Sequence, residues 1–198
     1  ICAMHQADAF VVAPIFYQEE LVAWCVTMTH LLDIGGADPG GATPSAREVF
    51  QEGIRIGGIK IAEGGMIRRD VIDSIVNMTR VPDIVELDLR AQIAAGTTVK
   101  ERLKELIEHH GVDTFKMLCE EAIKYSELKL RARIAELPDG RWQSAVYVDD
   151  DSKTDRVYQI FVTIIKEGDS LTFDYTGTSE QAPSYSNAGE VGGQGGVF

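Results

Sequence analysis

Cysteine is scarce in this chain of 198 residues. The three cysteines, Cys2, Cys25 and Cys119, are odd in number and widely spaced, and the sequence contains no CxxC pair. This excludes a disulfide framework and fits a protein of the reducing cytoplasm. Cys25 stands in an apolar, strand-like run, where it is better interpreted as a small core residue than as a nucleophile.

Other features are missing as well. The apolar stretches carry Glu or Asp too often for a transmembrane helix, and no signal peptide or targeting segment is visible. The sequence has no P-loop, no GxGxxG motif and no serine nucleophile elbow. Positively charged residues are also few: the chain has 19 Lys and Arg against 31 Asp and Glu, which gives a net charge of −12. We therefore expect no nucleic acid and no anionic membrane among the partners.

The remaining composition is that of a soluble globular chain. Apolar residues make up 44% and charged residues 25%. The length suits one large domain or two small ones with a real core. The chain opens at Ile1 inside apolar sequence and stops in the glycine-rich residues 192–198. We therefore expect it to be a piece of a larger polypeptide.

The first part of the chain predicts a β-hairpin. Residues 8–17 and 20–29 are rich in Val, Ile, Phe and Trp, and the polar pair Gln18-Glu19 separates them. Two such runs around a short polar joint are typical of antiparallel strands. Pro14 predicts an edge or a bulge in the first strand.

The middle of the chain is predicted to be helical. A capping box at residues 45–48 predicts a short helix that ends at Gly53, and a short strand is expected at 59–61. Residues 66–132 follow a helical pattern. Further helix starts are expected at residues 83–86 and 98–101, with C-terminal caps at Gly96 and Gly111.

From residue 133 the apolar period changes to two, which is typical of strands. The predicted strands are 133–137, 142–148, 156–166 and 170–176. Asp149-Asp150-Asp151 is interpreted as a solvated turn. The predicted fold class is α+β: a β-hairpin that carries the site (within 1–65), a helical middle (66–132) and a C-terminal antiparallel sheet (133–198).

A doubled motif near the start carries the chemistry. His5 and Asp8 form one HxxD, and His30 and Asp33 form a second that runs into the glycine-rich residues 35–41. A hairpin between them would bring the two motifs close together. Imidazole and carboxylate are ligands of catalytic zinc, manganese or iron. The alternative is that these are hydrogen-bonded polar residues or turn formers, since the spacing fixes no third or fourth ligand.

The glycine-rich residues 35–41 have a structural interpretation. They lack the spacing of a phosphate-binding loop and the Lys-Ser/Thr pair of a P-loop. We expect them to carry the backbone tightly past the site, because glycine allows close approach and positive φ.

Several stretches together resemble the hydantoinase B/oxoprolinase family. They are HQADAFVVAPIF (5–16), ELVAW (20–24), THLLDIGGADPGG (29–41), EVFQEGIRI (48–56), DLRAQIAAG (88–96) and FDYTGTSEQAPSYSNAG (173–189). The resemblance runs over nearly the whole chain. Gly57-Gly58 departs from it, because family members commonly carry a Pro-Pro pair there.

The resemblance implies a catalytic subunit of a hetero-oligomer. One branch of the family contains ATP-dependent hydantoinases and 5-oxoprolinases, and the other contains ATP- and bicarbonate-dependent ketone carboxylases. In both, a hydantoinase A-type partner subunit or domain handles ATP. By motif position, His5, Asp8 and His30 would bind a divalent metal (Zn, Mn or Fe), and Asp33 is a further candidate catalytic residue that supports His30.

Our leading hypothesis is the metal-bearing subunit of a carboxylase-like enzyme that acts on a ketone or enol with bicarbonate. The HQxD form and the Trp of LVAW favour this branch. The alternative is a subunit of an ATP-dependent hydantoinase or 5-oxoprolinase that hydrolyses a cyclic amide. A non-catalytic structural metal module of a large complex is the third possibility.

Overall fold

The computed structural model of the chain describes residues 5–184 and 187–188. These fall into two compact units, one containing residues 5–106, 184 and 187–188 and the other residues 107–183. Part of the last stretch that resembles the family, at 185–186 and 189, lies outside the described residues.

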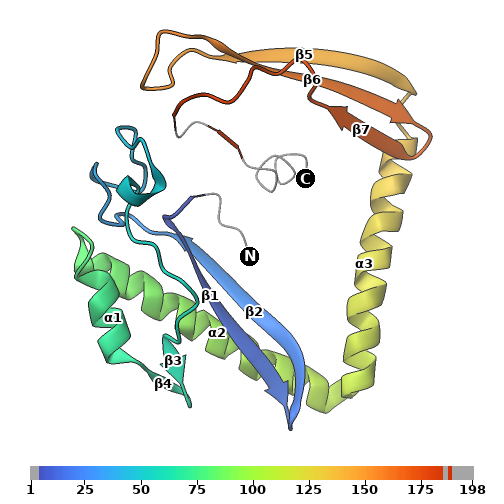
Figure 1. Cartoon of the computed structure of the whole chain (residues 1–198). Helices are drawn as coiled ribbons and strands as arrows, with labels where there is room; N and C mark the ends of the chain where they lie inside the picture. The colour runs from blue at the N-terminus through green and yellow to red at the C-terminus, as the bar shows by residue number, and fades with distance from the viewer. Residues whose placement is uncertain (1–4, 185–186, 189–198) are drawn as a thin grey trace. The chain divides into compact units, whose positions relative to one another are not determined.

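The first unit is built on the predicted hairpin. Strand β1 (Asp8–Tyr17) pairs antiparallel with β2 (Glu20–His30) (Figure 1). In this register Asp8 stands directly opposite His30. The register shifts between Ile15 and Phe16, directly after Pro14, so the predicted irregularity is confirmed. The hairpin therefore brings the ends of the two HxxD motifs together, as the sequence predicts.

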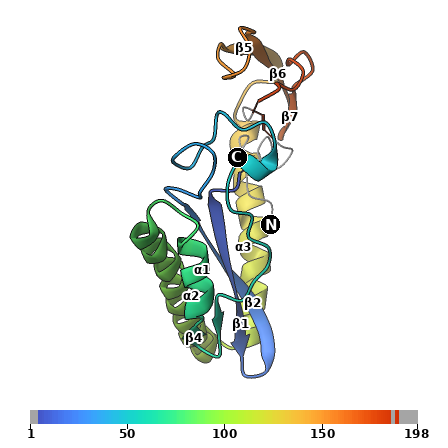
Figure 2. The same ribbon diagram turned by 60° about the vertical axis from the view of Figure 1, so that its left-hand side comes forward.

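Two helices pack beside this hairpin, α1 (Arg69–Val76) and α2 (Pro82–His110), as both ribbon views show (Figure 2). Along the sequence, the segment that connects β2 to α1 contains a single 3-10 turn, η1 (Val49–Gln51), and the short paired strands β3 (Ala62–Glu63) and β4 (Met66–Ile67). The core consists of the buried side chains Ala7, Leu31, Ile34, Ile72, Ile75, Val76, Val85 and Leu89.

Two helix predictions in this unit are wrong. The helix predicted from the capping box at 45–48 is reduced to the 3-10 turn η1, which begins only at Val49. The Ser45 amide donates to the Asp38 carboxylate at 2.8 Å, so it is not available to the capping box. Gly96 does not end a helix, since α2 continues through it and residue 98 begins no new one. A single glycine costs a helix only about 1 kcal/mol, which apolar packing outweighs. The strand expected at 59–61 is also displaced, to β3.

The second unit joins a long helix to an antiparallel sheet. Helix α3 (Val112–Ala135) follows Gly111, whose φ of +86° breaks the helix where a cap was predicted. The sheet has the order β5 (Gly140–Val148), β6 (Tyr158–Glu167), β7 (Ser170–Asp174). The strand predicted at 133–137 is wrong, since α3 continues to Ala135. The α+β class and its order of hairpin, helices and antiparallel sheet are confirmed.

The acidic turn 149–151 differs in part from its prediction. Asp149 and Asp150 are exposed, but Asp151 is fully buried and accepts hydrogen bonds from the Tyr158 hydroxyl at 2.7 Å and the Thr154 hydroxyl at 2.8 Å. Asp151 is therefore a structural residue that ties the loop to β6.

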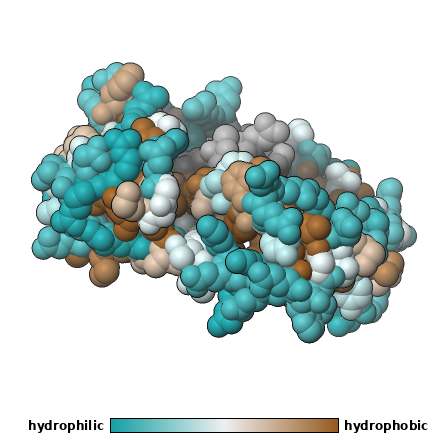
Figure 3. All heavy atoms as spheres, turned by 90° about the horizontal axis from the view of Figure 1, so that it is seen from below, coloured by the Kyte–Doolittle hydropathy of each residue, from teal (hydrophilic) through white to brown (hydrophobic). Residues whose placement is uncertain are grey.

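Many large apolar side chains lie on the surface. Figure 3 shows hydrophobic residues, in brown, that interrupt the hydrophilic surface on the face seen there. Among the exposed residues are Trp24 and Met28 on the hairpin, Ile123 and Leu128 on α3, and Tyr147 on β5. Within the described residues, no helix has the length and apolar character needed to cross a membrane.

Candidate metal centre

His5, Asp8 and His30 converge where the hairpin strands end. One ligand atom from each residue lies within 4.8 Å of the others. The distance from His5 Nε2 to Asp8 Oδ1 is 3.7 Å, and the two imidazole centroids are 4.7 Å apart at an angle of 62°. The predicted convergence of these side chains is therefore what the structure shows.

Backbone hydrogen bonds at the ends of β1 and β2 hold the residues that carry these side chains in place. Leu31 N–H donates to the carbonyl of Ala7 at 2.8 Å, and both residues are buried in the core. Asp8 N–H donates to the His5 carbonyl at 3.2 Å, which turns the chain just before β1. The buried neighbours thus hold the backbone, while the imidazoles are exposed and the Asp8 carboxylate is half-buried.

The donor set fits a divalent ion. Two imidazoles and one carboxylate suit zinc, manganese or iron. Ligands about 2.0–2.3 Å from one ion stand roughly 3–4 Å from each other, and the His5–Asp8 distance already falls in that range. Within the described part of the chain, this is the one group of three such residues close enough to share an ion.

Asp33 is placed differently from the other predicted site residues. It is buried, and it is not part of the cluster of His5, Asp8 and His30. Its Oδ1 accepts the amide of Gly35 at 2.8 Å, and its Oδ2 accepts the amide of Gly40 at 2.9 Å. Asp33 therefore holds the glycine-rich loop rather than facing the imidazoles.

Arg80 completes the surroundings of Asp33. The Arg80 amide donates to Asp33 Oδ1 at 3.1 Å, and its guanidinium donates to Oδ2 at 3.0 Å. Burial by itself raises the pKa of Asp33, but the hydrogen bonds from Gly40, Gly35 and Arg80 together outweigh it and lower the pKa to about 2. The carboxylate stays charged at neutral pH and binds its donors firmly.

The glycine-rich loop passes very close to the centre, as predicted. A Cβ on Gly41 would overlap the Cε1 atom of His30 and lie 3.1 Å from its Nε2. A Cβ on Gly36 would lie 2.7 Å from the carbonyl oxygen of Glu52. Gly35, with φ of +71°, would overlap the carbonyl of Met78. Glycine is required here for close backbone approach.

A cleft of about 1200 Å³ extends from His5 and Asp8 along the hairpin, the segment 52–67 and helix α2. Its wall is largely apolar, with two glutamines that have unused hydrogen-bonding groups. Gln6 Nε2 donates to the Val49 carbonyl at 3.0 Å, but its buried Oε1 has no partner among the described residues. Neither amide atom of the buried Gln92 has one there either. Such a wall suits a small organic molecule with polar groups.

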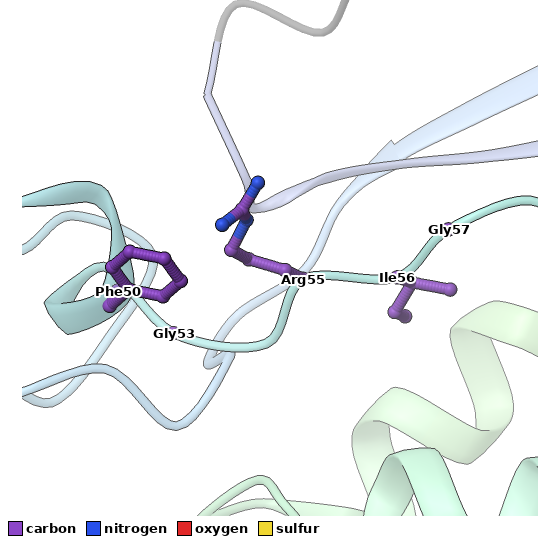
Figure 4. A pocket seen from close by; sticks show the side chains of 5 residues that line it. All are labelled: Phe50, Gly53, Arg55, Ile56 and Gly57. Atoms are coloured by element: carbon purple, nitrogen blue, oxygen red, sulfur yellow. The ribbon is translucent and has the colours of Figure 1, made fainter.

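A smaller hollow of about 520 Å³ is lined by Phe50, Gly53, Arg55, Ile56 and Gly57 (Figure 4). It shares the last three of these residues with the cleft. The guanidinium carbon of Arg55 lies 4.9 Å from the centre of the Phe50 ring, a cation–π contact that orders this exposed side chain. Arg55 thereby adds a positive charge to the cleft wall.

Sequence reasoning missed Arg80 and Gln92. Arg80 lies 47 residues after Asp33, and no local pattern connects the two. Gln92 falls in the stretch 88–96 that carries the family resemblance, so that stretch was the available signal. Buried glutamines are uncommon, but burial cannot be read from the helical pattern alone.

Comparisons with known proteins agree with this structure. The hydantoinase B/oxoprolinase family model matches residues 2–197. The chain is 37% identical to the putative B-type subunit of a D-/L-hydantoinase from Pseudomonas sp. strain NS671, over 90% of this chain and 31% of the relative. It is 30% identical to the acetophenone carboxylase delta subunit of Aromatoleum aromaticum, over 93% of this chain and 27% of the relative.

A solved structure has the same fold. The crystal structure of ATP-dependent caprolactamase from Pseudomonas jessenii superposes with a TM-score of 0.80 and 31% identity, over 91% of this chain and 31% of that chain. The chain thus spans about a third of the length of these three proteins. The resemblance found in its motifs is confirmed: the chain belongs to the hydantoinase B/oxoprolinase family.

Proposed function

We propose that this chain supplies the metal-binding part of the active site of an ATP-dependent enzyme that acts on a small carbonyl compound. The observation that carries the proposal is the convergence of His5, Asp8 and His30, of which His5 and Asp8 also line the cleft. A divalent ion held by these residues would act as a Lewis acid on a carbonyl or enolate oxygen.

The chain's own residues would do the binding and orienting. Asp8 would bring a negative charge to the ion, and the exposed imidazoles would leave room beside it for substrate. The apolar wall would exclude water, while Gln6, Gln92 and Arg55 would offer polar contacts to the substrate. A structural metal module would instead be closed by a fourth protein ligand, which the described residues do not offer here.

Carboxylation of a ketone or enol with bicarbonate is the reaction predicted from the sequence. The similarity to an acetophenone carboxylase subunit supports this choice. Hydrolysis of a cyclic amide is the second candidate, and it is favoured by the higher identity to a hydantoinase subunit and by the likeness to caprolactamase.

The partners follow from the same reasoning. We propose that ATP binds to a hydantoinase A-type subunit or domain rather than to this chain, in a cytoplasmic hetero-oligomer. The names of the relatives as subunits support an assembly of this kind.

The test uses the full-length protein together with its partner, purified without chelator. Elemental analysis should find a stoichiometric divalent metal. His30→Ala should lose both the metal and product formation while the partner keeps some ATP turnover. His110→Ala is the matched control, because His110 is an exposed histidine at the end of α2. A His30→Ala enzyme that keeps its metal and its product formation would contradict the assignment.

The same preparation separates the two reactions. Ketones and cyclic amides should be assayed with and without bicarbonate. Bicarbonate-dependent consumption of a ketone identifies a carboxylase, and bicarbonate-independent opening of a cyclic amide identifies a hydrolase.

A further inference from the structure

We propose that Arg80 is a positioning residue of the metal centre, which acts through Asp33 and the glycine-rich loop to fix the imidazole of His30. The inference rests on the proposed role of His30 as a metal ligand.

Arg80 reaches several parts of the loop at once. Its Nη2 donates to the carbonyl of Gly36 at 2.6 Å. Its Nη1 donates to Asp33 Oδ2 at 3.0 Å and reaches the carbonyl of Asp38 at 3.4 Å. Since one guanidinium binds three acceptors along residues 33–38, the start of the loop cannot shift without breaking these bonds.

The carboxylate of Asp33 also binds the far end of the loop. The amides of Gly35 and Gly40 both donate to its carboxylate, which spans the loop from within. We call the pair of Asp33 and Arg80 the clasp. The clasp therefore fixes the loop up to Gly40, and Gly41 follows directly.

The backbone at Gly41 packs directly against the imidazole of His30 and so restricts its position. There is no space for a Cβ between its backbone and His30, and the ring of His5 stands at 4.7 Å from that of His30. The His30 ring thus has the loop and the His5 ring as close neighbours. A loop free to move away from His30 would let its ring take other rotamers, and metal affinity would fall.

A general stabilising role explains Arg80 less well. Its side chain is 43% exposed, and the buried Asp33 carboxylate keeps the backbone amides of residues 35, 40 and 80 as donors when the guanidinium is removed, so we expect global stability to change little. It also lies outside the hydrophobic core. Lysine would supply the charge but not the planar fork that bonds several acceptors, so the geometry of arginine is what the loop uses.

The test compares Arg80→Met and Arg80→Lys with Arg69→Met in the full-length protein. Arg69 is a matched control, because it is an exposed arginine of the same unit that pairs with Glu86 at 3.1 Å, outside the loop. Binding of Mn²⁺ is followed by the EPR signal of the free ion. We expect Arg80→Met to raise the Kd about tenfold or more, Arg80→Lys to lie between, and Arg69→Met to match the wild type.

A second readout needs no metal. Hydrogen exchange of the amides in residues 33–41 should be faster in metal-free Arg80→Met than in metal-free Arg69→Met, while the melting temperatures of the two variants stay close. If Arg80→Met does not fold, Arg80→Lys serves in its place. Wild-type affinity or unchanged loop exchange in the folded Arg80 variant would overturn the inference. If the wild type binds no Mn²⁺ or Zn²⁺, the proposed metal site fails, and the exchange comparison still decides whether Arg80 orders the loop.

Discussion

Gly41 sets the space available to His30, so it offers a sharp test at the scale of one residue. Gly41→Ala would place a methyl group against the imidazole, which can swing away, and 3.1 Å from the carbonyl oxygen of Leu31, which would have to shift only slightly. We expect metal affinity to fall at least tenfold while the free energy of unfolding changes by less than about 1 kcal/mol. Metal titration and thermal unfolding measure the two effects separately.

Gly58→Ala is the control for this prediction. Gly58 has no heavy atom within 4 Å of a built Cβ and has no positive φ. An affinity of Gly41→Ala equal to that of Gly58→Ala would show that the loop does not constrain His30.

The charge of Asp33 makes the free energy of unfolding depend on pH in the acidic range. Its pKa is about 2 in the folded protein against 3.8 normally, so its contribution is complete above pH 3.8 and is lost as pH falls through 2. The contribution is roughly 1–2 kcal/mol, reduced by the partly exposed Arg80. The stability difference between wild type and Asp33→Asn, measured by urea unfolding, should therefore shrink from pH 6 to pH 2. A difference that stays constant would refute this role of the charge.

The sequence predicted the cluster but not the role of Asp33. Both motifs have the same HxxD spacing, yet Asp8 lies on a strand opposite His30, whereas Asp33 lies past the end of β2. There its backbone turns into the glycine-rich loop, and its partner Arg80 comes from a segment 47 residues away. Local spacing carries no information on such a long-range contact.

At the scale of elements, the connection between β5 and β6 depends on the Asp151–Tyr158 pair. The Tyr158 hydrogen bond is the largest cause that holds the pKa of Asp151 well below its usual range. Tyr158→Phe would remove this donor from a buried carboxylate, so we expect a melting temperature several degrees lower. Tyr147→Phe, on the exposed surface of β5, is the control and should leave it unchanged. Equal melting temperatures for the two variants would show that the pair contributes nothing measurable.

Elements with a strong periodic pattern were predicted well, and their interruptions were not. The hairpin strands were predicted correctly, because two apolar runs separated only by the polar pair Gln18-Glu19 are compatible with few structures other than an antiparallel hairpin. Gly96 was misread because packing of α2 overrides one unfavourable residue. Residues 133–135 were misread because their helix-favouring side chains simply continue α3.

At the scale of the molecule, the exposed apolar side chains are the feature that most strongly indicates contact with other protein surfaces. None of residues 112–135 of α3, all of them described, is buried, and β5 is exposed along almost its whole length. Large exposed apolar side chains, among them Ile123 and Leu128 on α3 and Trp142 and Tyr147 on β5, are typical of interfaces. Since the chain spans about a third of its relatives' length, we expect other parts of the polypeptide or partner subunits to cover them.

Residues 1–198 expressed alone should therefore associate. The net charge of −12 opposes precipitation, so soluble oligomers with a broad, non-cooperative thermal transition are the expected state. Analytical ultracentrifugation and calorimetry measure these properties, with the full-length protein and its partner as the control. Leu128→Lys on α3 should reduce association, because it places a charge within the exposed apolar surface. A monodisperse monomer with one cooperative transition would show instead that residues 1–198 are a self-sufficient domain whose apolar surface needs no cover.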